Sequence, residues 1–160
     1  MIVYHGSINI VTEPLIGIGR RNLDFGMGFY ITNIKDQVTR WAKQIAFREN
    51  KQAYLNVYDL DIEIIQKEFR YKKFDSYDED WLKFIISNRK GGSDWQKFDL
   101  IEGGVANDRV IDTVESYIIG NITLEGALGE LSKHQPNNQL CITNQDIIEK
   151  HLSFISAELC

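Results

Sequence analysis

The sequence predicts a mixed α+β fold in which short strands and helices are interspersed along one domain. Apolar runs that end in polar or glycine-rich turns, such as residues 1–7 and 98–105, are typical of short buried strands. Elsewhere apolar residues recur at helical spacing, most clearly over residues 34–45. The 160 residues hold no repeat, low-complexity tract or linker, and this length suffices to bury a core. We therefore expect a single domain over residues 1–160.

The first third of the chain is expected to contain two strands, a long loop and a helix. The strand at 1–7 leads into a loop at 12–28, because a proline and four glycines interrupt that stretch. A second strand is predicted at 29–32, after which Thr32 or Asn33 caps a helix. The apolar face of this helix is predicted to comprise Ile34, Val38, Trp41, Ala42 and Ile45.

The remainder continues the mixture of strands and helices. A strand rich in β-forming residues is predicted at 53–62, and the stretch 71–92 reads as a loop followed by a helix that ends at two glycines. Residues 98–105 read as a strand that enters a tight turn. The last predicted elements are helices within 107–120 and 123–133, a final strand at 138–143 and a closing helix within 144–156.

The charge of the chain argues against a broad nucleic-acid-binding surface. The formal net charge is −5 at pH 7, whereas such surfaces are basic. Residues 1–53 hold seven Lys or Arg against four Asp or Glu, a balance of +3, and residues 54–160 hold eleven against nineteen, a balance of −8. The basic third contains the glycine- and aromatic-rich segment, which suits a small ligand that carries phosphate.

Composition also predicts a location and a redox state. No run approaches the roughly 18 apolar residues of a membrane span, and the first residues lack the basic and apolar regions of a signal peptide. Cys141 and Cys160 are the only cysteines, and neither has metal-ligand spacing around it. We expect reduced thiols in a cytoplasmic protein without a metal site or a membrane partner.

Two short motifs in the basic third point to a ligand. "YHGS" occupies residues 4–7, and "FGMGFYI" occupies residues 25–31. Glycines beside aromatic residues indicate a backbone that closely approaches a flat group. The same glycines are also compatible with a simple turn.

These motifs resemble those of the histidine–tyrosine–glutamate group of ADP-ribosyltransferases, which contains diphtheria toxin and the poly(ADP-ribose) polymerases. That group has a His-Gly-Ser triplet at the end of its first core strand and a Phe-Gly-x-Gly-Ile-Tyr-Phe segment. It also has a second aromatic residue eleven positions further on, here Trp41, and an Asn-Glu pair that opens the last strand. "NQLCIT" at 138–143 is similar to that third motif, with Gln139 in place of the glutamate.

The resemblance implies a fold, an activity and partners. Over nearly its full length, including "FDLIEGGVANDRV" at 98–110, the chain resembles an uncharacterised bacterial family of this fold, often expected to supply the toxin of toxin–antitoxin pairs. The implied core is split, twisted and rich in antiparallel strands, with surrounding helices. The implied activity is mono-ADP-ribosyl transfer from NAD, as co-substrate, to a protein or nucleic-acid acceptor. A small antitoxin is the implied protein partner.

The resemblance also assigns roles to individual residues. His5 would bond the adenosine ribose, Gly6 the nicotinamide carboxamide and Gln139 the nicotinamide ribose, while Tyr30 and Trp41 would enclose the nicotinamide ring. The implied catalytic set is His5, Tyr30 and Gln139, and the implied cofactor-binding set is His5, Gly6, Ser7, Arg21, Gly28, Tyr30 and Trp41.

Structural roles remain open for most of these residues. His5 could be a buried structural histidine, Tyr30 an ordinary strand aromatic, and Trp41 a core residue. Arg20 and Arg21 could reach a pyrophosphate or simply be solvated. In 102–108, Glu102 and Asp108 could face a cleft, or the segment could form only a glycine turn and a helix cap at Asn107.

The departures from the group's pattern favour different functions. A glutamine can orient a ribose hydroxyl but cannot act as a base, so we expect transfer of single units at most. Val38 stands where the polymerases have a serine, which changes how the carboxamide is held. The alternatives to a transferase are a non-catalytic NAD- or nucleotide-binding module and an interaction domain that uses these motifs only as scaffold.

Overall fold

The expected α+β class is confirmed by a computed structural model, which describes residues 1–160 apart from the side chain of Asp108. The strands are β1 (Ile2–Ser7), β2 (Phe29–Ile31), β3 (Tyr54–Leu60), β4 (Tyr71–Lys73), β5 (Leu100–Gly103), β6 (Gln139–Ile142) and β7 (Leu152–Leu159). The helices are α1 (Lys35–Glu49), α2 (Ile62–Glu68), α3 (Glu79–Arg89), α4 (Asp108–Ile118), α5 (Leu124–Leu131) and α6 (Gln145–His151), with a 3₁₀ turn, η1 (Asp94–Lys97).

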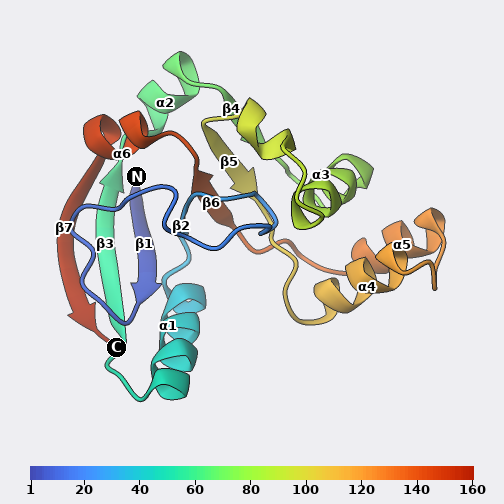
Figure 1. The fold of residues 1–160 in the computed structure, drawn as a ribbon, viewed down its shortest axis with the longest axis horizontal. Coiled ribbons are helices and arrows are strands. Elements are labelled where there is room, and N and C mark those ends of the chain that lie inside the picture. The colour runs from blue at the N-terminus through green and yellow to red at the C-terminus, as the bar shows by residue number, and fades with distance from the viewer.

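The strands form two sheets that meet at one point. The first sheet has the order β1-β3-β7, and the second has the order β2-β6-β5-β4. All pairs are antiparallel except β4 with β5. The sheets touch through a bridge in which Tyr4 and Thr32 exchange main-chain hydrogen bonds of 2.8 and 3.0 Å. Figure 1 shows the two sheets diverging from this contact between β1 and β2.

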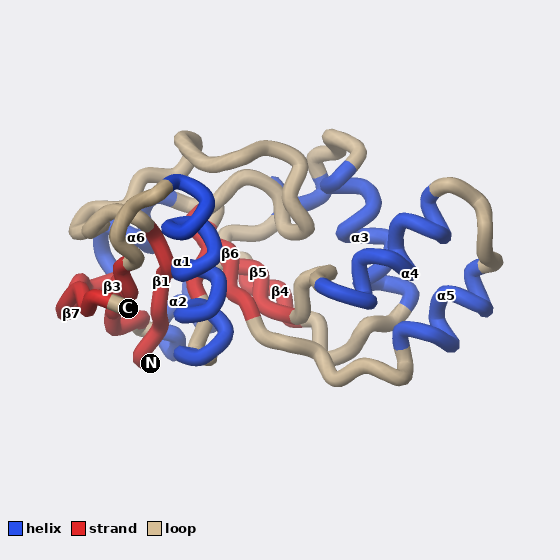
Figure 2. Tube along the Cα trace, turned by 90° about the horizontal axis from the view of Figure 1, so that it is seen from below, coloured by secondary structure: helices blue, strands red, loops and turns tan.

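Helices cover the sheets on separate sides and create two main cores. One core lies between the sheets and includes side chains from α2 and α6. The other lies between the second sheet and the helices α3, α4 and α5. Along the long axis of the molecule, Figure 2 shows the first sheet, the second sheet and then the α3–α5 group.

Helix α1 packs on β1 through part of the predicted apolar face, Val38 and Ala42, together with Ala46. Val38, Ala42 and Ala46 are buried, whereas Trp41 is 45% exposed. The glycine at position 6 brings β1 so close to the helix that only small side chains fit along the contact. Trp41 therefore lies on the flank of the helix, and the core role that the sequence left open for it is excluded.

The start of α1 differs from the prediction, whereas the start of α4 at Asn107 agrees with it. The N-cap of α1 is Ile34, whose apolar side chain cannot accept a capping bond, while the Thr32 hydroxyl accepts from the N–H of Ile34 at 3.0 Å and donates to the carbonyl of Asn138 at 2.6 Å. Asn107 is the N-cap residue of α4, also without a side-chain bond. The open question about the Asp108 side chain lies outside the described residues.

The C-terminal segment is half helix and half strand. Instead of one closing helix, α6 ends at His151 and the next residues form β7, which pairs with β3. Two further elements, α2 and β4, were not predicted from the sequence. The strands β4 and β7 depend on partners that are distant in sequence, because β4 pairs with β5 and β7 pairs with β3.

We predict that Gly6→Ala destabilises the protein. A Cβ at position 6 would lie 2.8 Å from the carbonyl oxygen of Val38 and 3.0 Å from the Ala42 methyl group. Overpacking of this kind costs about 1–3 kcal/mol, measurable as a lower free energy of unfolding in urea.

Gly129→Ala is the matched control. Gly129 lies in α5, and a Cβ added there would have no described atom of another residue within 4 Å beyond the backbone of its own helix. This change should raise the free energy of unfolding by up to about 1 kcal/mol, because alanine favours helix. Wild-type stability of Gly6→Ala would contradict the close packing of α1 on β1.

Candidate functional site

Strand β2 presents its residues alternately to the two cores. Phe29 and Ile31 are buried between the sheets, whereas Tyr30 packs toward the core under α3–α5. Tyr30 lies opposite Cys141 of β6, so the two side chains share one face of the second sheet. We therefore build the candidate site around this face of β2.

The loop at residues 25–28, which contains Gly26 and Gly28 and precedes β2, is the glycine loop. The Tyr30 hydroxyl bonds its backbone. It donates to the carbonyl of Gly26 at 2.7 Å and accepts from the N–H of Phe25 at 3.1 Å. Burial raises the pKa of the Tyr30 phenol well above its usual range, which keeps the hydroxyl protonated. The hydroxyl thus serves the loop, and the aromatic ring is the part of Tyr30 that remains for a ligand.

Both loop glycines are explained by close packing within the chain. Gly26 has a φ of +80°, and any Cβ there would overlap the indole ring of Trp95 in η1. A Cβ at Gly28 would lie 2.5 Å from the carbonyl oxygen of Ile142. The flat group that approaches Gly26 in this structure is therefore the Trp95 indole.

His5 links β1 to the backbone of β2. Its Nδ1 lies 2.8 Å from the carbonyl oxygen of Tyr30, and its ring centroid lies 4.5 Å from that of Phe29. Because a carbonyl only accepts hydrogen bonds, Nδ1 carries the proton and Nε2 is left as an acceptor. Burial lowers the pKa of His5, which favours this neutral form. Nε2 is thus suited to a hydroxyl donor.

Gly6 shares a side of the molecule with Tyr30 and α1. Continuing the register of the Tyr4–Thr32 bridge puts Gly6 opposite Tyr30, and the Cβ direction of Gly6 points at α1. Trp41 belongs to that helix and is half exposed. Ser7, the next residue of β1, accepts a bond from the N–H of Asn9 at 3.1 Å and so shapes the following turn.

Gln139 begins β6 on the same face as Tyr30. It pairs with Gly103, and two residues later Cys141 pairs with Tyr30, so strand alternation puts Gln139 and Tyr30 on one side. The side chain of Gln139 is half buried. A polar amide therefore stands at the open end of the strand next to Tyr30.

The structure brings some of the expected residues together and separates others. Gly6, Tyr30 and Gln139 lie on one side of the strands, with α1 next to Gly6. The His5 ring packs instead on Phe29, whose side chain points to the opposite face of β2. Arg21 is exposed in the loop before β2, as is its neighbour Arg20.

Asp24 anchors the site, although it was not among the residues predicted from the sequence. Its carboxylate is only 6% exposed and accepts bonds from Nε of Arg89 at 2.5 Å and from the N–H of Ala106 at 2.6 Å. The carbonyl of Asp24 accepts a further bond from Asn88 at 2.8 Å. Asp24 directly precedes the glycine loop, but no sequence pattern indicated its partner in α3.

Glu102 belongs to a second buried network. The Tyr71 hydroxyl donates to one of its carboxylate oxygens, and the Asn138 amide donates to the other at 3.2 Å. Asn138 directly precedes Gln139 and also donates to Asn33 at 3.0 Å. Glu102 thus holds the start of β6 in place, which is more than forming part of a glycine turn.

Two further findings limit the chemistry of the described residues. Among them, no group of three or more His, Cys, Asp or Glu side chains is arranged to hold a metal ion. None of the described helices is long and apolar enough to cross a membrane.

We predict that His5 makes folding stability depend on pH. Its pKa in the folded chain is lowered from the ordinary value, so the unfolded chain binds the proton more readily. The stabilisation is complete above the unfolded pKa of about 6.5 and is lost as the pH falls below it. Urea unfolding between about pH 7.5 and 5.5 should show this loss in the wild type and a smaller loss in His5→Asn.

The control is His134→Asn, since His134 follows α5 and lies outside both sheets. That variant should keep the wild-type pH dependence. If His5→Asn and the wild type lose stability in parallel, His5 does not carry the effect.

The comparisons with known proteins identify one family. A model of the family described as "Protein of unknown function (DUF3990)" matches residues 1–154. The comparison with curated proteins found no match, and the comparison with solved structures found none. Because the family model covers nearly all of the 160 residues, the chain belongs to the DUF3990 family.

Proposed function

We propose that this protein is a mono-ADP-ribosyltransferase with an ADP-ribosyltransferase-like fold that uses NAD. The observation that carries the proposal is the common side of Gly6, Tyr30 and Gln139, three residues from motifs far apart in the sequence. Helix α1, which packs on Gly6 through Val38 and Ala42, also carries the half-exposed Trp41. The two sheets that diverge from β1 and β2 are compatible with the split core of that fold.

The reaction that we propose breaks the bond between the nicotinamide nitrogen and the ribose. The electron pair of that bond leaves with nicotinamide, and the acceptor's nucleophile forms the new bond to the ribose carbon while its proton passes to solvent. The transition state has oxocarbenium character, so a site must hold the nicotinamide ring flat and fix its ribose. Tyr30 and Trp41 supply aromatic faces, each worth about 0.5–1.5 kcal/mol beyond burial in such a contact.

The adenosine half of NAD is assigned to the seam between the two sheets. In this proposal Nε2 of His5 accepts a bond from a ribose hydroxyl, which its tautomer allows. The Nδ1 bond to Tyr30 fixes the ring and, with it, the spacing between β1 and β2. Arg21, in the exposed loop, is the group proposed to reach the pyrophosphate.

Gln139 sets the expected outcome of the reaction. Its amide oxygen can accept a bond from the nicotinamide-ribose hydroxyl, but an amide does not take up a proton near neutral pH. We therefore propose transfer of single units. The same feature favours the second candidate, a non-catalytic NAD- or nucleotide-binding module, because binding needs orientation but no base.

By its resemblance to toxin families, we also propose that the transferase is a bacterial toxin restrained by a small antitoxin. The acceptor is a protein or a nucleic acid in this proposal. If substitution of the site residues abolished toxicity, the proposed role as a toxin would be linked to the proposed transfer reaction.

NAD is predicted to bind and to require Trp41. At 100 times its dissociation constant, NAD should add about 2.7 kcal/mol of stability, measurable as a raised melting temperature. Trp41→Ala should weaken binding at little cost in stability, because the side chain is 45% exposed. Trp41→Phe keeps an aromatic face and should bind NAD nearly as the wild type does.

Phe47→Ala is the matched control for this experiment. Phe47 lies in the same helix and is 89% exposed, so its loss removes an aromatic residue without touching the proposed site. An unchanged melting temperature at millimolar NAD would rule out the NAD site.

Gln139 is predicted to act mainly on the rate of transfer. Gln139→Ala should lower the rate of nicotinamide release and of label transfer from NAD at least tenfold, with little change in NAD affinity. Gln139→Glu restores a carboxylate and should raise both rates. Expression of the wild type should arrest bacterial growth, and Gln139→Ala at equal protein level should relieve the arrest.

If the wild type binds NAD but neither hydrolyses nor transfers it, the binding module replaces the transferase. Equal rates for the three Gln139 forms would remove Gln139 from the catalytic set.

A further inference from the structure

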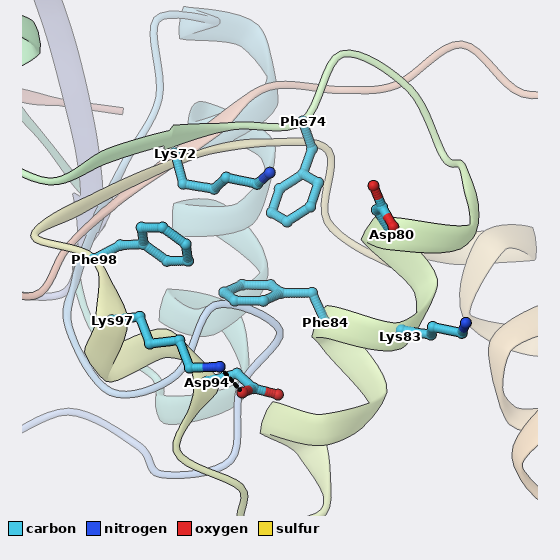
Figure 3. A pocket seen from close by; sticks show the side chains of 8 residues that line it. All are labelled: Lys72, Phe74, Asp80, Lys83, Phe84, Asp94, Lys97 and Phe98. Atoms are coloured by element: carbon cyan, nitrogen blue, oxygen red, sulfur yellow. Dashed lines mark hydrogen bonds and ion pairs between the residues drawn. The ribbon is translucent and has the colours of Figure 1, made fainter.

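A cavity of about 280 Å³ lies at the edge of the second sheet, away from Gly6 and α1. It is an open hollow lined by residues in or next to β4, α3 and η1, and Figure 3 shows three phenylalanine rings turned toward its centre. These rings belong to Phe74, Phe84 and Phe98. The proposed transferase uses none of them.

The three rings are neighbours but are tilted to one another, by 42° between Phe74 and Phe84 and by 58° between Phe84 and Phe98. The centroids of Phe74 and Phe84 lie 5.0 Å apart, and those of Phe84 and Phe98 lie 6.0 Å apart. Phe84 and Phe98 are only partly buried, so parts of both rings remain accessible in the cavity. A planar ring can stack on the accessible face of one of these rings and meet the edge of its neighbour, and aromatic stacking is a sequence-tolerant way to hold a nucleobase.

Lys72 adds a positive charge above these rings. Its ammonium nitrogen lies 4.8 Å from the centroid of Phe74, and no described carboxylate forms an ion pair with it. Two other lysines of the cavity are paired, Lys97 with Asp94 at 2.8 Å and Lys83 with Glu79 at 2.7 Å. Figure 3 also shows the Lys83 ammonium directed away from the rings. Lys72 is therefore the cation that can meet an anionic ligand.

Two carboxylates restrict the ligand further. Asp80 and Asp94 also line the cavity, and ionised carboxylates only accept hydrogen bonds. They would repel a highly charged ligand but accept bonds from the ring and amino N–H groups of a nucleobase. The cavity volume of about 280 Å³ falls just below the range of about 300–1,000 Å³ for small-molecule sites, which suits a mononucleotide better than NAD.

We propose that this cavity binds a purine nucleoside monophosphate. The base stacks on Phe98 and meets the edge of Phe84, the phosphate pairs with Lys72, and Asp80 or Asp94 accepts from the base edge. The source of this group is a free nucleotide or a nucleotide of a single-stranded nucleic acid, which present the same chemistry. The proposal does not rest on the transferase activity, because it involves no reaction and none of the residues of that site.

The cavity lies a short distance from the candidate site. Phe74 follows β4, and its N–H donates to the carbonyl of Glu102 in β5 at 2.8 Å. Gly103 of β5 pairs in turn with Gln139 of β6. Two strand spacings of about 4.8 Å each thus separate the aromatic wall from the start of β6.

The test uses GMP as the probe, because an adenine nucleotide would also report on the proposed NAD site. Isothermal titration of the full chain should show GMP binding, with guanosine or inorganic phosphate alone at least tenfold weaker. Lys72→Gln and Phe98→Leu should each weaken GMP binding at least tenfold. Trp41→Ala should leave it unchanged.

Lys73→Gln is the matched control for Lys72→Gln. The two lysines are neighbours in β4, but alternation directs Lys73 to the other face, where it pairs with Asp75 at 4.0 Å. GMP affinity should survive this change. Melting temperatures near that of the wild type would show that each variant is folded.

Some outcomes distinguish the two sources of the nucleotide, and others would overturn the proposal. A short guanine-containing single-stranded oligonucleotide that binds more tightly than GMP supports a nucleic-acid source, and equal or weaker binding supports a free nucleotide. Absence of GMP and oligonucleotide binding at millimolar concentration overturns the proposal. Equal losses in Lys72→Gln and Lys73→Gln overturn it as well, because the effect would then be one of net charge.

Discussion

The buried carboxylate of Asp24 holds together the parts on which the candidate site depends. It receives bonds from α3 through Arg89 and from the turn after β5 through Ala106, while Asn88 bonds its carbonyl. Loss of one partner from such a pair typically costs about 3–5 kcal/mol, because the remaining charge stays buried. The glycine loop starts at the next residue, so this ion pair fixes where the loop begins. The Tyr30 hydroxyl then fixes where it ends.

This anchoring explains how a strand of three residues can serve two sheets. Phe29 and Ile31 of β2 fill the core between the sheets, and Tyr30 fills part of the other core. On one side β2 pairs with β6, and on the other it meets β1 through a single bridge and through His5. A strand this short gains little from pairing alone, so the loop before it must already be positioned. The geometry of the candidate site therefore depends on the packing of side chains on both faces of β2.

Local patterns in the sequence predicted the elements whose signals are local. The helical spacing around Val38 and the glycines after α3 predicted those helices, and the β-forming residues of β3 and the apolar run of β5 predicted those strands. The misses needed information from distant residues: β7 forms because β3 offers an edge, and Trp41 is exposed because Gly6 selects small residues on α1. The resemblance of the motifs to those of the ADP-ribosyltransferases implied that Tyr30 and Gln139 belong to one site. The pairing of Asp24 with Arg89 joins residues 65 positions apart and left no pattern in the sequence.

The chemistry of the proposed site is constrained by the carboxylates around it. Both oxygens of Asp24 already accept bonds, from Arg89 and from Ala106, and both oxygens of Glu102 do so from Tyr71 and Asn138. Neither carboxylate is therefore presented as a general base for an acceptor, and Gln139 has no such capacity. Under the proposed transferase, the enzyme contributes orientation and aromatic binding, and the acceptor must be a nucleophile that loses its proton to solvent. A site of this kind selects its acceptor by placement rather than by activation.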